Sequence, residues 1–187
     1  MALSPHRPEA PRFAEIGVAS AFSFLRGASQ PEELVVTAKR LGLEGLGLAD
    51  RNTVAGVVRA YQAAKEAGLA FAPGARLVFA DETPDIFAYP RDRAGWGRLC
   101  RLLSLGNLRA EKGTCLLERG DLLDWGEGLN LALLAPDWLG SFEPEDADHL
   151  EALRRSLDAL SAAFPGHVHL AIAPRHDGFD ERRLARA

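Results

Sequence analysis

The sequence predicts an α/β fold, because short apolar runs suited to buried strands alternate with segments of helical periodicity. Such alternation implies a largely parallel sheet with right-handed crossovers. The chain has 187 residues, 47% of them hydrophobic, which suits one globular domain. An open doubly wound sheet and a closed barrel both fit this pattern. Neither of the nucleotide-binding patterns G-x-G-x-x-G and G-x-x-x-x-G-K-[ST] occurs.

The first part of the chain predicts two strands that alternate with two helices. Ser29, followed three residues later by Glu32, predicts a capping box at the start of the first helix. Gly68 stands where a left-handed C-cap would end the second helix. The expected elements are a strand at 13–19, a helix at 31–41, a strand at 43–49 and a helix at 53–67.

The rest of the chain continues the alternation, and the turn at 81–83 predicts a hairpin-like link between the third and fourth strands. Residues 1–12 hold three prolines and are expected to form a flexible leader. The remaining expected elements are strands at 69–79, 85–89, 129–135 and 167–173, helices at 93–105, 121–125 and 147–163, a polar loop at 106–115, and a final helix that begins in DERRLARA.

Charge and cysteine content exclude some classes of protein. The net charge of -4 argues against an independent nucleic-acid binder, which would normally be basic. The two cysteines, Cys100 and Cys115, are too few for a disulfide scaffold. The N-terminus has no apolar signal region and no run approaches the length of a membrane span, so we expect a cytoplasmic protein without membrane contact.

Two stretches carry a family resemblance. Residues 20–33, SAFSFLRGASQPEE, and residues 41–68, which begin LGLEGLGLADRNT, resemble the opening of the PHP (polymerase and histidinol phosphatase) domain of error-prone bacterial C-family DNA polymerases, which are DNA polymerase III alpha-subunit-like. The segment GWGRLCRL and the C-terminal RHDGFDERRLARA resemble later parts of such polymerases. The resemblance implies a distorted, incomplete (β/α) barrel of the PHP type, with a partial PHP domain over residues 13–187.

The resemblance also implies where a metal site would lie. A PHP domain with a working site has His-x-His after the first strand, where this chain has Gly17 and Ala19. Thr-Asp-His is replaced by Ala49-Asp50-Arg51, Gly-x-Glu by Gly74-Ala75-Arg76, and the next family histidine aligns with Asp85. Glycine, alanine and arginine cannot ligate these metals, so we expect no metal and no cofactor. Asp50 is expected to pair with Arg51 or Arg76, or to cap the helix that begins near Thr53.

Other side chains offer alternatives. His167, His169 and His176, together with His149, could form a rearranged metal site, although no carboxylates accompany them. Arg26 could bind a phosphate, or the loop could simply pack Phe22, Phe24 and Leu25 over the barrel mouth while Gly27 makes a turn. Six basic residues could contact a polymerase module or nucleic acid, or could form a solvated helix face: Arg91, Arg93, Arg98, Arg101, Arg109 and Lys112.

These observations favour a non-catalytic PHP module of an error-prone DNA polymerase alpha-type subunit, which supports translesion synthesis in DNA repair and replication. The parent would be a nucleotidyltransferase, but this chain has no pair of catalytic aspartates in a polymerase setting. Its partner would be the polymerase core of the parent chain or another DNA-repair protein, with DNA contacted only through the full polymerase. Two alternatives are a metal-dependent phosphoesterase with a rearranged site and a free-standing protein-binding module derived from a PHP domain.

Overall fold

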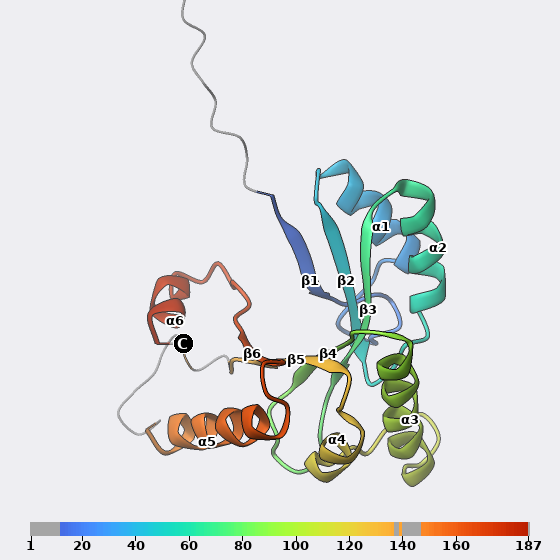
Figure 1. The fold of residues 1–187 in the computed structure, drawn as a ribbon. Helices are drawn as coiled ribbons and strands as arrows, with labels where there is room; N and C mark the ends of the chain where they lie inside the picture. The colour runs from blue at the N-terminus through green and yellow to red at the C-terminus, as the bar shows by residue number, and fades with distance from the viewer. Residues whose placement is uncertain (1–11, 137–138, 140–146, 187) are drawn as a thin grey trace, which may run out of the picture.

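Six strands form one curled sheet in the order β1-β2-β3-β4-β5-β6, with helices on its outer side (Figure 1). The computed structural model describes residues 12–136, 139 and 147–186. The strands are β1 (Ala14–Val18), β2 (Gly45–Arg51), β3 (Ala70–Leu77), β4 (Ile86–Pro90), β5 (Leu129–Leu134) and β6 (Val168–Ala171). The helices are α1 (Pro31–Arg40), α2 (Val57–Ala67), α3 (Arg93–Arg109), α4 (Arg119–Trp125), α5 (Ala147–Ala163) and α6 (Asp180–Arg186).

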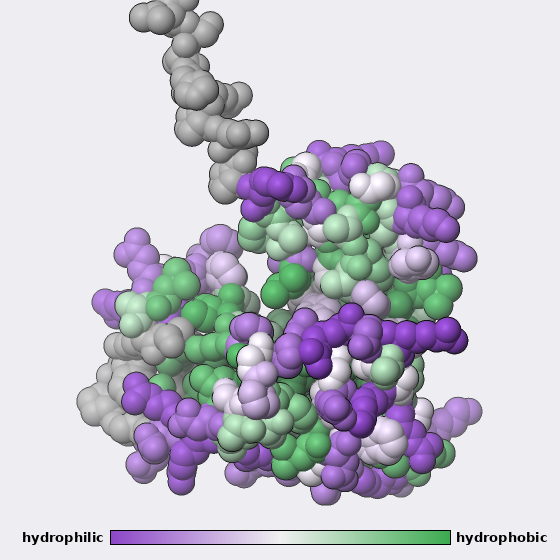
Figure 2. All heavy atoms as spheres, viewed as in Figure 1, coloured by the Kyte–Doolittle hydropathy of each residue, from purple (hydrophilic) through white to green (hydrophobic). Residues whose placement is uncertain are grey.

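The sheet confirms the predicted mostly parallel, incomplete barrel. β1, β2 and β3 pair in parallel, as do β5 and β6, whereas β4 is antiparallel to both of its neighbours. The predicted hairpin-like link therefore joins β3 to β4. β1 and β6 form the two edges of the sheet. Figure 2 shows a hollow between the part that carries α6 and the part that carries β1, so the described sheet curls without closing.

Two apolar cores lie on the helix-covered face. One joins α1 and α2 to β2, through Val35, Ala60 and Leu48, all fully buried. The larger core joins α3, α4 and α5 to the middle strands, where leucines dominate the buried set. No helix of the described ranges is both long and apolar enough to cross a membrane.

The inner face of the sheet is built differently, because one glycine on each of the first three strands leaves space there. Gly47 on β2 and Gly74 on β3 face the Tyr89 ring, which lies 3.2 Å and 2.5 Å from where a Cβ atom would stand on each glycine. Phe87, two residues earlier on β4, has its ring beside Gly17. Two aromatic rings of β4 therefore fill the space that the glycines leave on the inner face.

Most element boundaries match the sequence predictions, and Gly68 takes the expected left-handed conformation with φ 60°. The predicted capping box is displaced by one residue, because the Gln30 backbone amide donates to the Glu33 carboxylate at 2.8 Å. α3 continues to Arg109 through the start of the predicted polar loop. α2 begins at Val57 rather than at residue 53, because Asn52 has φ 49° and its amide side chain bonds to the Val78 backbone. The predicted leader lies outside the described residues except for Arg12.

Candidate functional site

The candidate site lies at the edge of the sheet where the parallel strands end, which is the face that carries reactive groups in α/β barrels. Asp50, near the end of β2, is 1% exposed. Its Oδ1 accepts hydrogen bonds from the Ser20 backbone amide (2.7 Å) and the Ser23 hydroxyl (2.6 Å), and its Oδ2 accepts one from the Ser20 hydroxyl (2.7 Å). Ser20 and Ser23 are also buried. The carboxylate therefore ties the loop at 20–29 to β2 and has its oxygens occupied by donors.

The prediction that Asp50 pairs with an arginine is wrong. Arg76 instead pairs with Asp85, with 2.6 Å between Nε and Oδ2 and 2.5 Å between Nη2 and Oδ2. Arg51 extends from the end of β2 into solvent, and only its backbone amide bonds to Ser23. Asp50 does not cap α2 either, because the N-cap of that helix is Gly56. The two buried serine hydroxyls and the Ser20 amide satisfy the Asp50 carboxylate, so it needs no arginine partner.

Gly17 occupies a position that excludes a larger residue. Its φ is +76°, a conformation that side-chain-bearing residues rarely adopt, and an added Cβ atom would lie 2.7 Å from the Phe87 ring. Its backbone amide donates to the Tyr89 hydroxyl at 2.8 Å. Burial, with a smaller effect from the charge of Glu15, raises the pKa of Tyr89 to about 12, so this phenol stays neutral. The inner face beside β1 is therefore closed by aromatic packing.

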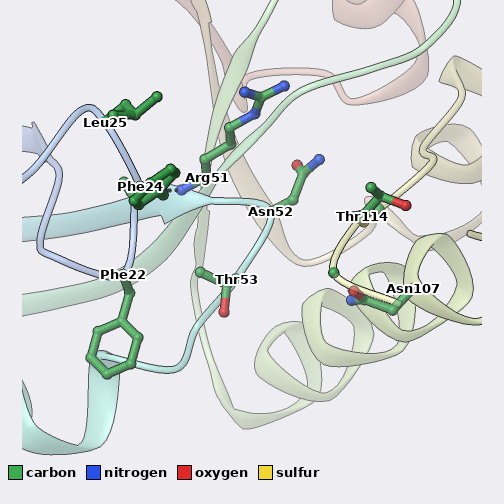
Figure 3. A pocket seen from close by; sticks show the side chains of 11 residues that line it. Phe22, Phe24, Leu25, Arg51, Asn52, Thr53, Asn107 and Thr114 are labelled. Carbon is green, nitrogen blue, oxygen red and sulfur yellow. Dashed lines mark hydrogen bonds between the residues drawn. The ribbon is translucent and has the colours of Figure 1, made fainter. Parts of the chain in front are cut away.

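A pocket of about 580 Å³ opens beside the end of β2 (Figure 3). The loop at 20–29 contributes Phe22, Phe24 and Leu25, and the opposite wall comes from Asn107 and Thr114. The predicted packing of this loop over the mouth is wrong for its tip, because Phe24 is 85% and Leu25 is 89% exposed. The turn of this loop has its positive φ at Leu25, at 62°.

The histidines do not converge. His167 Nε2 lies 2.7 Å from Nη1 of Arg91, and its Nδ1 lies 3.1 Å from Oδ1 of Asn130. Since arginine can only donate, Nε2 is the acceptor and its lone pair is occupied. His169 and His176 are exposed, and His149 lies on α5. Within the described ranges, no group of three or more His, Cys, Asp or Glu side chains could hold a metal ion.

The predicted basic surface is largely used in local contacts. Arg98 bonds to Glu127 at 2.5 Å, Arg101 lies over the Trp125 ring, and Arg109 forms a two-bond pair with Asp121 at 2.8 Å. These contacts support the interpretation of a solvated helix face.

The curled sheet, the helices and the strand-end site define the class of fold, an α/β half-barrel. The model of the PHP domain matches residues 16–186, and the chain belongs to this family. A crystal structure of a proposed metal-dependent phosphoesterase from Bifidobacterium adolescentis superposes with a TM-score of 0.63 at 19% identity, covering 97% of this chain and 84% of that one. An amidohydrolase structure from Chromobacterium violaceum, with bound sulfate and no metal, has a TM-score of 0.52 at 16% identity and covers 81% and 74%.

The relatives found by sequence share a higher identity with this chain than these structures do. An error-prone DNA polymerase of Mesorhizobium japonicum is 54% identical over 177 residues, and error-prone DNA polymerase 1 of Rhizobium meliloti is 54% identical over 173 residues. An error-prone DNA polymerase of Rhodopseudomonas palustris is 49% identical over 180 residues. These matches cover 94%, 92% and 94% of this chain but only 15% of each relative. The chain thus spans a small part of the polymerases it matches.

The residues where the resemblance implies a metal site do not fit a metal cluster. Gly17 has no room for a ligand side chain, and Ala19 has no donor atom. The Asp50 oxygens are taken by serine and amide donors, and Asp85 is taken by the Arg76 guanidinium. A cation placed there would have to displace each of these contacts.

Sequence reasoning missed the side chains that decide this geometry. The sequence pattern predicts no contact between Asp50 and either Ser20 or Ser23, and it places Phe87 and Tyr89 only within a strand. One signal was available: two serines just after a strand suit a buried carboxylate on the neighbouring parallel strand, because both strands end at the same edge of the sheet.

Proposed function

We propose that the chain is a non-catalytic PHP module of an error-prone DNA polymerase alpha-type subunit, acting in the cytoplasm as structural support for translesion synthesis. One observation carries the proposal: four of the positions where the resemblance implies metal ligands are occupied by contacts between protein groups. Asp50 binds the 20–29 loop, Asp85 binds Arg76, and Gly17 packs on Phe87. The similarity to error-prone polymerases supports the choice of parent protein.

Hydrolysis of a phosphoester by a metal site needs metal-bound hydroxide and cations that offset phosphate charge. The decisive experiment is therefore metal analysis of the purified chain after incubation with manganese or zinc, followed by exonuclease and phosphatase assays. We expect neither stoichiometric metal nor turnover above buffer. Chelator-sensitive hydrolysis that is abolished by His167→Ala or His169→Ala would overturn the proposal and favour the rearranged phosphoesterase.

The supporting role needs a contact surface, and we propose the tip of the 20–29 loop. Phe24 and Leu25 are adjacent, apolar and 85% and 89% exposed, and exposed apolar groups of this size often mark interfaces. The relatives carry a polypeptide several times longer than the matched region, so the occupant we propose is the polymerase core of the same polypeptide.

The contact can be tested in a full-length polymerase that contains this chain. Phe24→Ser with Leu25→Ser should leave the stability of the 187-residue chain unchanged but lower the melting temperature and primer extension of the full-length protein. Leu41→Ser is the matched control, because Leu41 is 72% exposed at the end of α1, far from the loop tip in sequence. If the paired variant and the control behave alike in the full-length protein, the loop tip is not the contact.

A further inference from the structure

We propose that the pocket beside the end of β2 binds an acidic side chain, flanked by apolar residues, from the polymerase core of the same polypeptide. The choice of partner rests on the proposed function, in which the core contacts the tip of the 20–29 loop. The pocket lies between this loop, the turn after β2 and the segment that follows α3 (Figure 3). Its volume of about 580 Å³ is that of a small-ligand site, so a short peptide segment fits there.

Arg51 is the only charged residue that lines this pocket in the part of the chain that the structure describes. Its side chain is exposed and forms no ion pair or hydrogen bond with any described residue. By contrast, Arg59, Arg76 and Arg98 each pair with a carboxylate of the same chain. A guanidinium carries a permanent charge and a planar set of donors that matches a carboxylate. The uncommitted guanidinium therefore favours an acidic group on the partner.

The wall opposite Arg51 has hydrogen-bond acceptors to offer rather than donors. The Asn107 side-chain amide donates to the Leu103 carbonyl oxygen at 2.6 Å, and the Thr114 hydroxyl donates to the Glu111 carbonyl oxygen at 2.8 Å. The oxygen atoms of these two side chains can still accept a hydrogen bond, for example from the backbone amides of a peptide. The acidic group of the partner therefore belongs on the Arg51 side, with its backbone toward the opposite wall.

Ser23 holds the charge and the apolar loop tip next to each other. Its hydroxyl donates to the Asp50 carboxylate at 2.6 Å and accepts from the Arg51 backbone amide at 3.0 Å. Phe24 and Leu25 follow it directly in the chain, and Figure 3 shows both on the same side of the pocket as Arg51. A buried anchor thus fixes the backbone that presents these three side chains. Such a preformed surface loses little conformational entropy when a partner binds.

The charge of the pocket favours a protein segment over nucleic acid. Proteins that bind a nucleic-acid strand place several cations along its backbone. A single cation lines this pocket among the described residues, and the whole chain has a net charge of -4. A protein segment with one acidic residue beside an apolar one needs only one cation and one apolar surface, and the pocket has both.

The test is photo-crosslinking in a full-length polymerase that contains this chain, with Phe24 replaced by p-benzoylphenylalanine, in the absence and presence of primer–template DNA. We expect a crosslink to a peptide of the polymerase core that carries an aspartate or glutamate, identified by mass spectrometry. Arg51→Glu should lower the crosslink yield about fivefold, because an attractive charge pair becomes repulsive. Arg40→Glu is the matched control, at an exposed arginine in the last turn of α1, and should leave the yield unchanged.

A charge exchange separates a lost ion pair from a general disturbance. Replacing the acidic residue of the crosslinked peptide by lysine, in the Arg51→Glu background, should restore the yield. The proposal is overturned if the yield is not restored, if no core peptide is crosslinked, or if the crosslink joins the DNA instead. A core crosslink that is insensitive to Arg51→Glu also overturns it but leaves the loop-tip contact of the proposed function standing. The metal analysis tests the non-catalytic role independently of all these outcomes.

Discussion

The ends of β1 and β2 and the ends of β3, β5 and β6 lie on the same edge of the sheet but are stabilised by different chemistry. At the first, Asp50 is buried among serine hydroxyls, and aromatic rings close the space beside Gly17. At the second, aspartates pair with arginines beside a smaller pocket. The strand ends of one sheet edge can therefore be stabilised in two ways: by buried packing beside β1 and β2, and by ion pairs beside β3, β5 and β6.

The largest expected effect concerns the packed end. Asp50→Ala should lower the free energy of unfolding by about 4 kcal/mol, because it leaves three buried donors without their acceptor. Asp50→Asn should cost less, since its amide oxygen still accepts. Chemical denaturation measures both, and Asp158→Ala on the exposed side of α5 serves as the control. A loss no greater than that of the control would show that the buried network does not hold the 20–29 loop.

Gly17→Ala tests the aromatic closure and should cost about 3 kcal/mol, from a left-handed backbone conformation and overpacking against Phe87. Gly42→Ala is a matched control, because Gly42 has φ +75° but nothing within 4 Å of an added Cβ atom. It should cost about 1 kcal/mol from the backbone alone. Thermal and chemical denaturation give both values. Equal losses would mean that Phe87 yields and that the end is less tightly packed than the structure indicates.

Tyr89→Phe should cost about 1 kcal/mol at neutral pH through the lost hydrogen bond to the Gly17 amide. The pKa of Tyr89 is raised to about 12, above its ordinary value of about 10, so folding favours the neutral phenol. This contribution is fully present below pH 10 and is lost as the pH rises through about 12. Denaturation across that window should show a decline that Tyr89→Phe reduces. Tyr61→Phe, at a 55% exposed residue, should leave the decline intact.

The smallest effect belongs to the ion-paired end. A double-mutant cycle with Arg76→Ala and Asp85→Ala should give a coupling energy of about 0.5–1 kcal/mol, because both side chains are partly exposed and screened. The side chains are 22% and 24% exposed, whereas those of the control pair Arg12 and Glu44 are 82% and 47% exposed. The control pair should couple more weakly. A coupling as large as the Asp50 effect would erase the distinction between the two ends.

The alternation of strands and helices was readable from the sequence because it depends on local periodicity. α5 was predicted at its observed bounds, Ala147–Ala163, since its apolar positions follow the helical repeat. The capping box was displaced because both Ser29–Glu32 and Gln30–Glu33 satisfy the same spacing. Local pattern could not choose between them.

The contacts of the site could not be predicted from the sequence, because they join residues far apart in the chain. Asp50 meets Ser20 across 30 residues, and Gly17 meets the Tyr89 hydroxyl across 72. Which face of β4 turns inward depends on the register between strands, and this register decides that Phe87 rather than Ile86 meets Gly17. The family resemblance implies positions for a site but says nothing of the partners of these residues.

The contact between Gly17 and Phe87 also constrains any path by which such a chain could regain a ligand there. A histidine at position 17 would meet the ring before it met a metal, so the aromatic residue at position 87 must become smaller first. Until a ligand is in place, that first change only opens a cavity and costs stability. The substitution at position 87 must therefore come first, and the resulting intermediate is less stable than the present protein. A ligand side chain at position 17 is, in this sense, harder to introduce than to remove.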